Sequence, residues 1–156
     1  MAALSFKFAA GTLVALLLSS HPGAARAQED DFNAALARAY ENLSALERRQ
    51  GDRRDADVYM ARAQAAQRGE APAPEAPDAR APFLDGAHLP ALSSAHMRLV
   101  TALDAGARAK AAQPAARAQS SYDCWLEQAS EDLQPEHVSA CRDAFTAAMA
   151  AVDEAL

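Results

Sequence analysis

The chain has 156 residues, of which 43 are alanine and only six are glycine, and its formal net charge is −6. Aromatic and β-branched residues are too scarce for a β-sandwich or barrel, and six glycines are too few for a glycine-rich phosphate-binding fold. The negative charge argues against nucleic acid or an anionic membrane surface as partner. Because alanine is the best helix former, we expect an all-α fold.

Residues 1–27 are typical of a secretory signal peptide. A basic residue precedes the apolar run 8–18, a Pro-Gly pair follows it at 22–23, and small residues at 25 and 27 place the predicted cleavage between Ala27 and Gln28. Eleven apolar residues would span about 16 Å as a helix, whereas the hydrocarbon core is roughly 30 Å thick. We therefore expect a cleaved signal helix rather than a membrane anchor.

Export would place the mature chain in the periplasm, with association with the outer membrane left open. Cleavage would remove Lys7 and Arg26 but no acidic residue, which makes the protein more acidic. After the cleavage site the sequence contains no apolar run of spanning length, so we expect no transmembrane span.

The segment 28–69 predicts a helical hairpin. Apolar residues recur at helical spacing over 29–50, and Gly51 and Asp52 are suited to end one helix and cap the next. The second helix is expected to end at Gly69. This layout resembles one tetratricopeptide-type unit, but the sequence shows no second copy at a fixed period. The first apolar stripe consists of Phe32, Leu36, Tyr40, Leu43 and Leu46.

Residues 70–90 interrupt the helical pattern. Four prolines between positions 69 and 82 favour extended, polyproline-like chain. We interpret the segment as a semi-rigid connector; a docking motif for a proline-reading domain is the alternative.

Residues 91–156 predict the rest of a bundle of about five helices. The pattern places helices at 90–111, 114–131 and 135–154, with Pro114 and Pro135 near the helix starts and a turn at 132–134.

The two cysteines, Cys124 and Cys141, lie at equal distances from that turn. They should therefore be level with each other across the last helical pair, as a disulfide requires. An oxidising compartment permits the bond, and in the chain-entropy model a loop of this size stabilises by roughly 3 kcal/mol. Free thiols, or a metal site that includes His137, are the alternatives.

The sequence lacks the motifs of common active sites. His88, His96 and His137 have no evident acid, base or nucleophile beside them, and neither a G-x-S-x-G nor an HExxH sequence is present. We expect no enzymatic activity, no catalytic residues, no cofactor and no bound metal.

Several segments resemble the α-helical N-terminal region of OmpA-family envelope proteins of alphaproteobacteria. They are 121–128 (SYDCWLEQ), 134–136 (QPE), 140–145 (ACRDAF), 98–104 (RLVTALD) and the hairpin 43–69. In that family a peptidoglycan-binding domain follows. The chain ends at Leu156, about where the family's linker would begin, and the peptidoglycan-binding residues have no counterpart here. The resemblance therefore implies an envelope location without peptidoglycan binding.

Together these features predict an exported, non-enzymatic helical module that acts through protein–protein contacts in the envelope, with a partner of unknown identity. A chaperone-like or apolar-ligand-binding protein is the alternative, with a groove between hairpins. Its candidate apolar contact residues are Phe32, Tyr40, Tyr122, Trp125 and Phe145.

Overall fold

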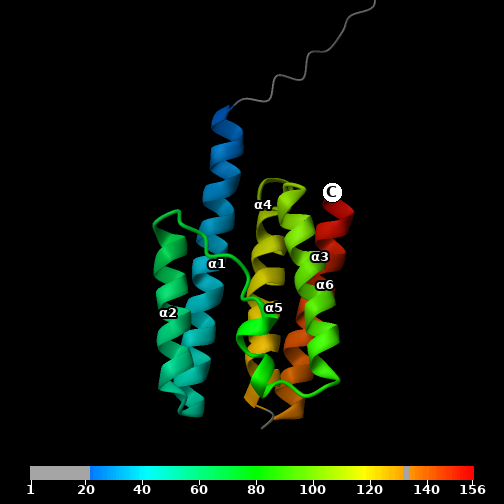
Figure 1. Ribbon diagram of the computed structural model, residues 1–156. Coiled ribbons are helices and arrows are strands. Elements are labelled where there is room, and N and C mark those ends of the chain that lie inside the picture. Colours follow the sequence, from blue (N-terminus) through cyan, green and yellow to red (C-terminus); the bar gives the residue numbers. More distant parts are fainter. Residues whose placement is uncertain (1–21, 132–133) are drawn as a thin grey trace, which may run out of the picture.

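The computed structural model describes residues 22–131 and 134–156, and every regular element in these ranges is helical (Figure 1). The predicted all-α bundle is confirmed. Residues 1–21 of the predicted signal peptide and residues 132–133 of the predicted turn lie outside the described residues. The α-helices are α1 (Pro22–Gln50), α2 (Arg53–Gln67), α3 (His88–Asp104), α4 (Ala107–Lys110), α5 (Ala112–Glu131) and α6 (Pro135–Ala155), and two 3-10 helices, η1 (Pro77–Ala79) and η2 (Ala81–Phe83), separate α2 from α3.

Helices α1 and α2 form the predicted antiparallel hairpin. Gly51 has a φ of 95°, a left-handed conformation that glycine adopts without strain. Asp52 caps α2, because its side chain accepts a hydrogen bond of 2.9 Å from the backbone N–H of Asp55. The hairpin turn therefore follows directly from two adjacent residues in the sequence.

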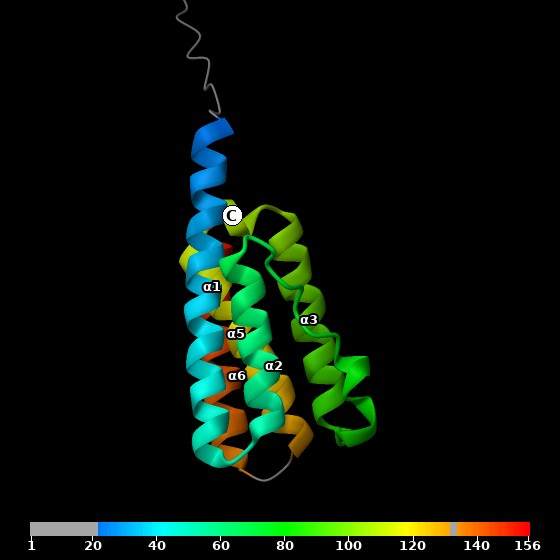
Figure 2. The same ribbon diagram turned by 90° about the vertical axis from the view of Figure 1, so that its left-hand side faces the viewer.

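Helix α1 begins earlier than the sequence pattern predicts, at Pro22 rather than near residue 29. Proline is accepted at the first helical position, and the alanines that follow it favour helix. The first turns of α1 project beyond the other helices (Figures 1 and 2), and residues 26–31 are exposed. The predicted cleavage site lies on this projection, before the buried residue Phe32.

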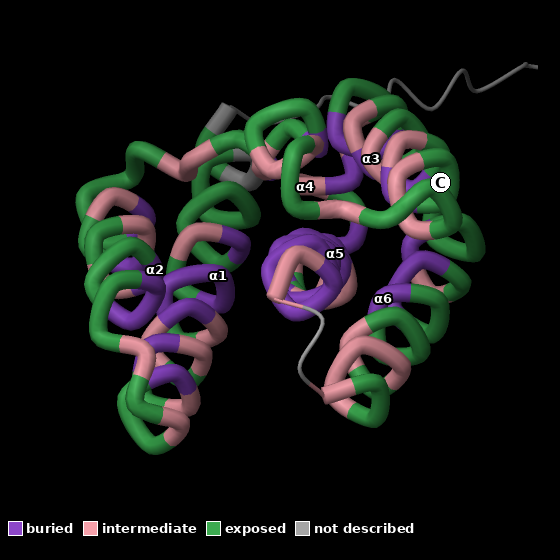
Figure 3. Tube along the Cα trace, turned by 60° about the horizontal axis from the view of Figure 1, so that its bottom comes forward, coloured by how far each residue is buried: buried purple, intermediate pink, exposed green. Residues whose placement is uncertain are grey.

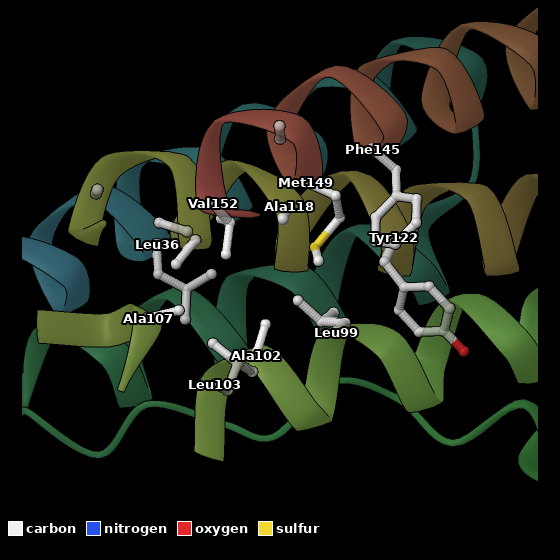
Figure 4. Close-up of a cluster of buried hydrophobic side chains, with 14 of the residues drawn as sticks. Leu36, Leu99, Ala102, Leu103, Ala107, Ala118, Tyr122, Phe145, Met149 and Val152 are labelled. Atoms are coloured by element: carbon white, nitrogen blue, oxygen red, sulfur yellow. The ribbon is translucent and has the colours of Figure 1, made fainter. Parts of the chain in front are cut away.

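Helix α5 is the centre of the bundle. Figure 3 shows α5 between α1 and α6, and eight consecutive residues, 122–129, are buried. Apolar side chains from α1, α3, α4, α5 and α6 meet around it (Figure 4). The labelled members of this cluster are Leu36, Leu99, Ala102, Leu103, Ala107, Ala118, Tyr122, Phe145, Met149 and Val152.

The predicted helix over 90–111 is wrong at its C-terminal end. Helix α3 ends at Asp104, and Gly106 has a φ of 94° immediately before the four-residue α4. A left-handed residue cannot continue a right-handed helix, so the chain turns here. Helix α5 starts at Ala112, and Pro114 occupies its first turn, where a missing N–H costs little.

The proline-rich segment is extended only in part: residues 70–76 have no regular secondary structure, whereas the 3-10 helices η1 and η2 follow them. The segment is packed against the bundle rather than spanning free space. Pro74 and Pro77 are buried, and the segment runs from the end of α2 to the start of α3 (Figure 2). Its backbone hydrogen-bonds to buried side chains of α5. The segment thus connects α2 to α3 while it is held against α5.

Within the described ranges, no helix combines the length and the apolar character that a membrane crossing requires.

Candidate functional site

The C-terminal pair of helices is joined as the cysteine positions predict. Cys124 of α5 and Cys141 of α6 form a disulfide, with their Cα atoms 5.8 Å apart. In the structure this pairing leaves neither sulfur available as a thiolate ligand. It therefore favours the disulfide over free thiols or a metal site with His137.

A groove lies over this disulfide, with α5 as its floor and α1 and α6 as its walls. Its volume is about 330 Å³. Small residues dominate its lining, so a partner backbone could approach closely. The lining residues are Ala39, Asn42, Leu43, Ser120, Ser121, Cys124, Ala140, Cys141 and Ala144.

A buried polar network holds the floor of the groove to the neighbouring hairpin. Asp123, on α5, is fully buried and accepts hydrogen bonds from the Tyr40 hydroxyl at 2.5 Å and from Nη2 of Arg62 at 2.7 Å. Its other carboxylate oxygen accepts the backbone N–H of Glu75 at 2.8 Å. One side chain thus contacts α1, α2 and the proline-rich segment.

Further bonds close the network around the Tyr40 hydroxyl. Arg62 and the amide of Gln119 donate to it at 2.9 and 3.0 Å, and the same amide donates to the carbonyl of Pro72 at 2.6 Å. Burial and the neighbouring Asp123 raise the pKa of Tyr40 well above its usual value, so the hydroxyl keeps its proton and donates it to the carboxylate.

The charge of Asp123 is balanced within this network. Burial raises the pKa of Asp123, whereas Arg62 and the hydrogen bonds from Tyr40 and Glu75 act to lower it. Arg62 also donates to the carbonyl of Ala73 at 2.7 Å. A buried carboxylate with an arginine and two further donors has a structural role: it fixes the proline-rich segment and the hairpin onto α5.

The five predicted apolar contact residues do not line the groove. Each is at most 6% exposed, and they pack as core. Phe145 lies with its ring centroid 6.0 Å from those of Tyr122 and Trp125. The prediction that they form an accessible wall is wrong, because each occupies the inward-facing stripe of its helix. They are Phe32, Tyr40, Tyr122, Trp125 and Phe145.

The histidines at positions 88, 96 and 137 lie in separate places. His88 faces Asp85 across 3.0 Å near the start of α3. His96 packs against Tyr122 with ring centroids 5.5 Å apart, and His137 lies 3.4 Å from the Gln50 side-chain amide. The structure does not bring them together.

Comparisons with protein-family models, curated proteins and solved structures give no match for this chain. The resemblance to OmpA-family proteins therefore stays a prediction from the sequence.

Proposed function

We propose that the protein is an exported, non-enzymatic helical module that binds another envelope protein through the groove over the Cys124–Cys141 disulfide. The observation that carries this proposal is the groove itself, formed by three helices and lined largely by alanine, serine and the disulfide. An α-helix of the partner, presenting small apolar side chains, has the shape and chemistry to occupy it.

Two features support an exported location. The apolar run 8–18 precedes a small-residue cleavage motif, and the disulfide suits an oxidising compartment. The OmpA-family resemblance adds the envelope as the compartment. The chaperone-like alternative is not proposed, because the aromatic residues that it requires are buried in the core.

Site-specific photo-crosslinking in the producing cell tests the groove. A photoreactive side chain in place of Ala144, which lines the groove, should give one discrete adduct with an envelope protein. The matched control replaces Ala150, an exposed alanine of α6 that does not line the groove. Equal labelling from both positions, or no adduct from Ala144, would contradict the proposal.

Co-purification with the partner that the adduct identifies provides a second test. Ala144→Trp should fill the groove and abolish the interaction, whereas Ala150→Trp should leave it unchanged. Both positions are exposed on one helix, so folding should be affected equally, and circular dichroism checks this.

Export is tested separately by N-terminal sequencing of the protein from the periplasmic fraction. We expect the chain to begin at Gln28. A periplasmic protein that retains residue 1 would contradict the signal-peptide prediction.

A further inference from the structure

Three carboxylates meet at the end of the bundle where α1 turns into α2. Asp52 and Asp55 come from the start of α2, and Glu131 comes from the last turn of α5. One carboxylate oxygen of each lies within 4.8 Å of the others. We call these three residues the acidic cluster.

Glu47 of α1 provides an independent observation. It is fully buried, yet within the described residues neither of its carboxylate oxygens has a hydrogen-bond partner. Ser44, one turn earlier, donates to the carbonyl of Ala56, so this face of α1 is turned toward the start of α2. The carbonyl of Glu47 accepts the backbone N–H of Asp52 at 2.9 Å, which places the residue beside the cluster.

The electrostatics of Glu47 agree with this placement. Burial raises its pKa to about 7, and the next causes are the charges of Glu131, Asp52 and Asp55. The Glu47 carboxylate is therefore within electrostatic range of all three residues of the acidic cluster, and no donor in the described chain satisfies it.

Glu127 of α5 repeats the pattern. It lies one turn before Glu131 and is fully buried, and its Oε1 atom has no hydrogen-bond partner in the part of the chain that the structure describes. Its other oxygen accepts from the Gln128 amide at 2.7 Å. Burial and the charge of Glu47 raise its pKa to about 8. Glu47 and Glu127 are thus two buried carboxylates that influence the acidic cluster electrostatically and retain acceptor oxygens unpaired within the described residues.

Arg54, Arg62 and Arg80 line the same pocket as the acidic cluster, but within the described residues only Arg80 is ion-paired with a member of the cluster. Nη1 of Arg80 lies 3.4 Å from Asp55, whereas its shorter ion pair, 2.8 Å from Nε, is with Glu75. Arg80 is shared between Asp55 and Glu75, and within the described residues Asp52 and Glu131 have no ion pair. A bound cation would remove both the repulsion and the unsatisfied acceptors.

We propose that the acidic cluster of Asp52, Asp55 and Glu131 binds a calcium ion, with Glu47 and Glu127 supplying further carboxylate oxygens. Calcium takes six to eight oxygen ligands at about 2.3–2.6 Å in flexible geometry, so oxygens 4.8 Å apart can contact the same ion. Asp52 is suited to a double role, because only its Oδ1 atom accepts the capping bond. The calcium site is separate from the groove and does not depend on it.

Calorimetric titration of the full chain with calcium chloride tests the proposal. After treatment with a chelator, we expect one site with a Kd on the order of 0.1–1 mM, the range of extracellular calcium modules. Magnesium should bind more weakly, because it requires smaller, near-octahedral geometry. Absence of binding at about 10 mM calcium would overturn the proposal.

Two variants and a control locate the site. Glu131→Gln and Glu47→Gln each remove one carboxylate and should weaken calcium binding by about tenfold or more. Glu154→Gln removes an exposed carboxylate at the other end of α6 and should leave binding unchanged. Circular dichroism in chelator shows that each variant is folded. Equal calcium affinity in all three would overturn the assignment.

A thermal measurement distinguishes binding from screening. Calcium should raise the wild-type Tm by several degrees over sodium chloride of the same ionic strength. An equal rise with sodium chloride would mean that calcium only screens the carboxylates, and would also overturn the proposal.

Discussion

Asp123 and Glu47 are both buried carboxylates in one bundle, but their surroundings are opposite. Asp123 accepts hydrogen bonds from Tyr40, Arg62 and the Glu75 backbone, whereas neither oxygen of Glu47 has a partner among residues 22–131 and 134–156. A satisfied buried charge holds elements together, and an unsatisfied one destabilises the protein unless something binds it. The comparison separates a structural residue from a candidate ligand-binding residue.

The largest expected effect comes from breaking the satisfied site. Asp123→Ala would leave Arg62 and Tyr40 without their acceptor and release the proline-rich segment, at a cost of about 3–5 kcal/mol in the free energy of unfolding. Urea denaturation measures the loss. Asp143→Ala, at an exposed position of α6, should change stability by less than about 0.5 kcal/mol. A similarly small change for Asp123→Ala would show that the network does not fix the proline-rich segment and the hairpin onto α5.

The next effect concerns the covalent link across the groove floor. Reduction of the Cys124–Cys141 disulfide should lower the free energy of unfolding by roughly 3 kcal/mol in the chain-entropy model. Mass spectrometry should record a gain of about two daltons on reduction. The double variant Cys124→Ser, Cys141→Ser should be insensitive to reductant. Free thiols in the native protein would contradict the pairing.

The smallest effect is expected at Glu47, where the substitution should raise the free energy of unfolding rather than lower it. A pKa of about 7 at Glu47 exceeds that of an unfolded glutamate, so the neutral form is favoured on folding. The contribution of protonated Glu47 to the free energy of unfolding is fully present at pH values below the pKa of glutamate in the unfolded chain. It is lost as the pH rises through about 7, the pKa of Glu47 in the folded protein. In chelator at about pH 8 we therefore expect Glu47→Gln to be more stable than wild type by about 1 kcal/mol.

Thermal unfolding at two pH values checks this prediction. The advantage of Glu47→Gln should disappear near pH 5, below its folded pKa. Glu154→Gln, an exposed change, should give no such pH-dependent difference. A Glu47→Gln variant that is less stable than wild type at both pH values would mean that Glu47 has a favourable partner.

The local features of the fold could be predicted because they depend on neighbouring residues. Gly51 and Asp52 define the hairpin turn, and the cysteines lie level because they are equally spaced from the next turn. The break at Gly106 was missed, because the alanines on either side continue a helical pattern and only the positive φ reveals the turn.

Neither carboxylate site could be predicted in the same way. Arg62 and Glu75 are 61 and 48 residues from Asp123 in sequence, and only the packing of α2 and the proline-rich segment on α5 brings them together. The expectation of no bound metal considered the two cysteines and His137, and it did not consider Glu47 or Glu127. The signal available was their position: each lies on the inward face of its helix, in register with apolar neighbours.

A crystal grown with calcium and measured for anomalous scattering tests the central comparison most directly. The account predicts a peak about 2.3–2.6 Å from carboxylate oxygens of Asp52, Asp55 and Glu131, and none at Asp123. The proposal would be contradicted if the crystals show calcium at Asp123 or only at surface carboxylates, with no peak at the acidic cluster.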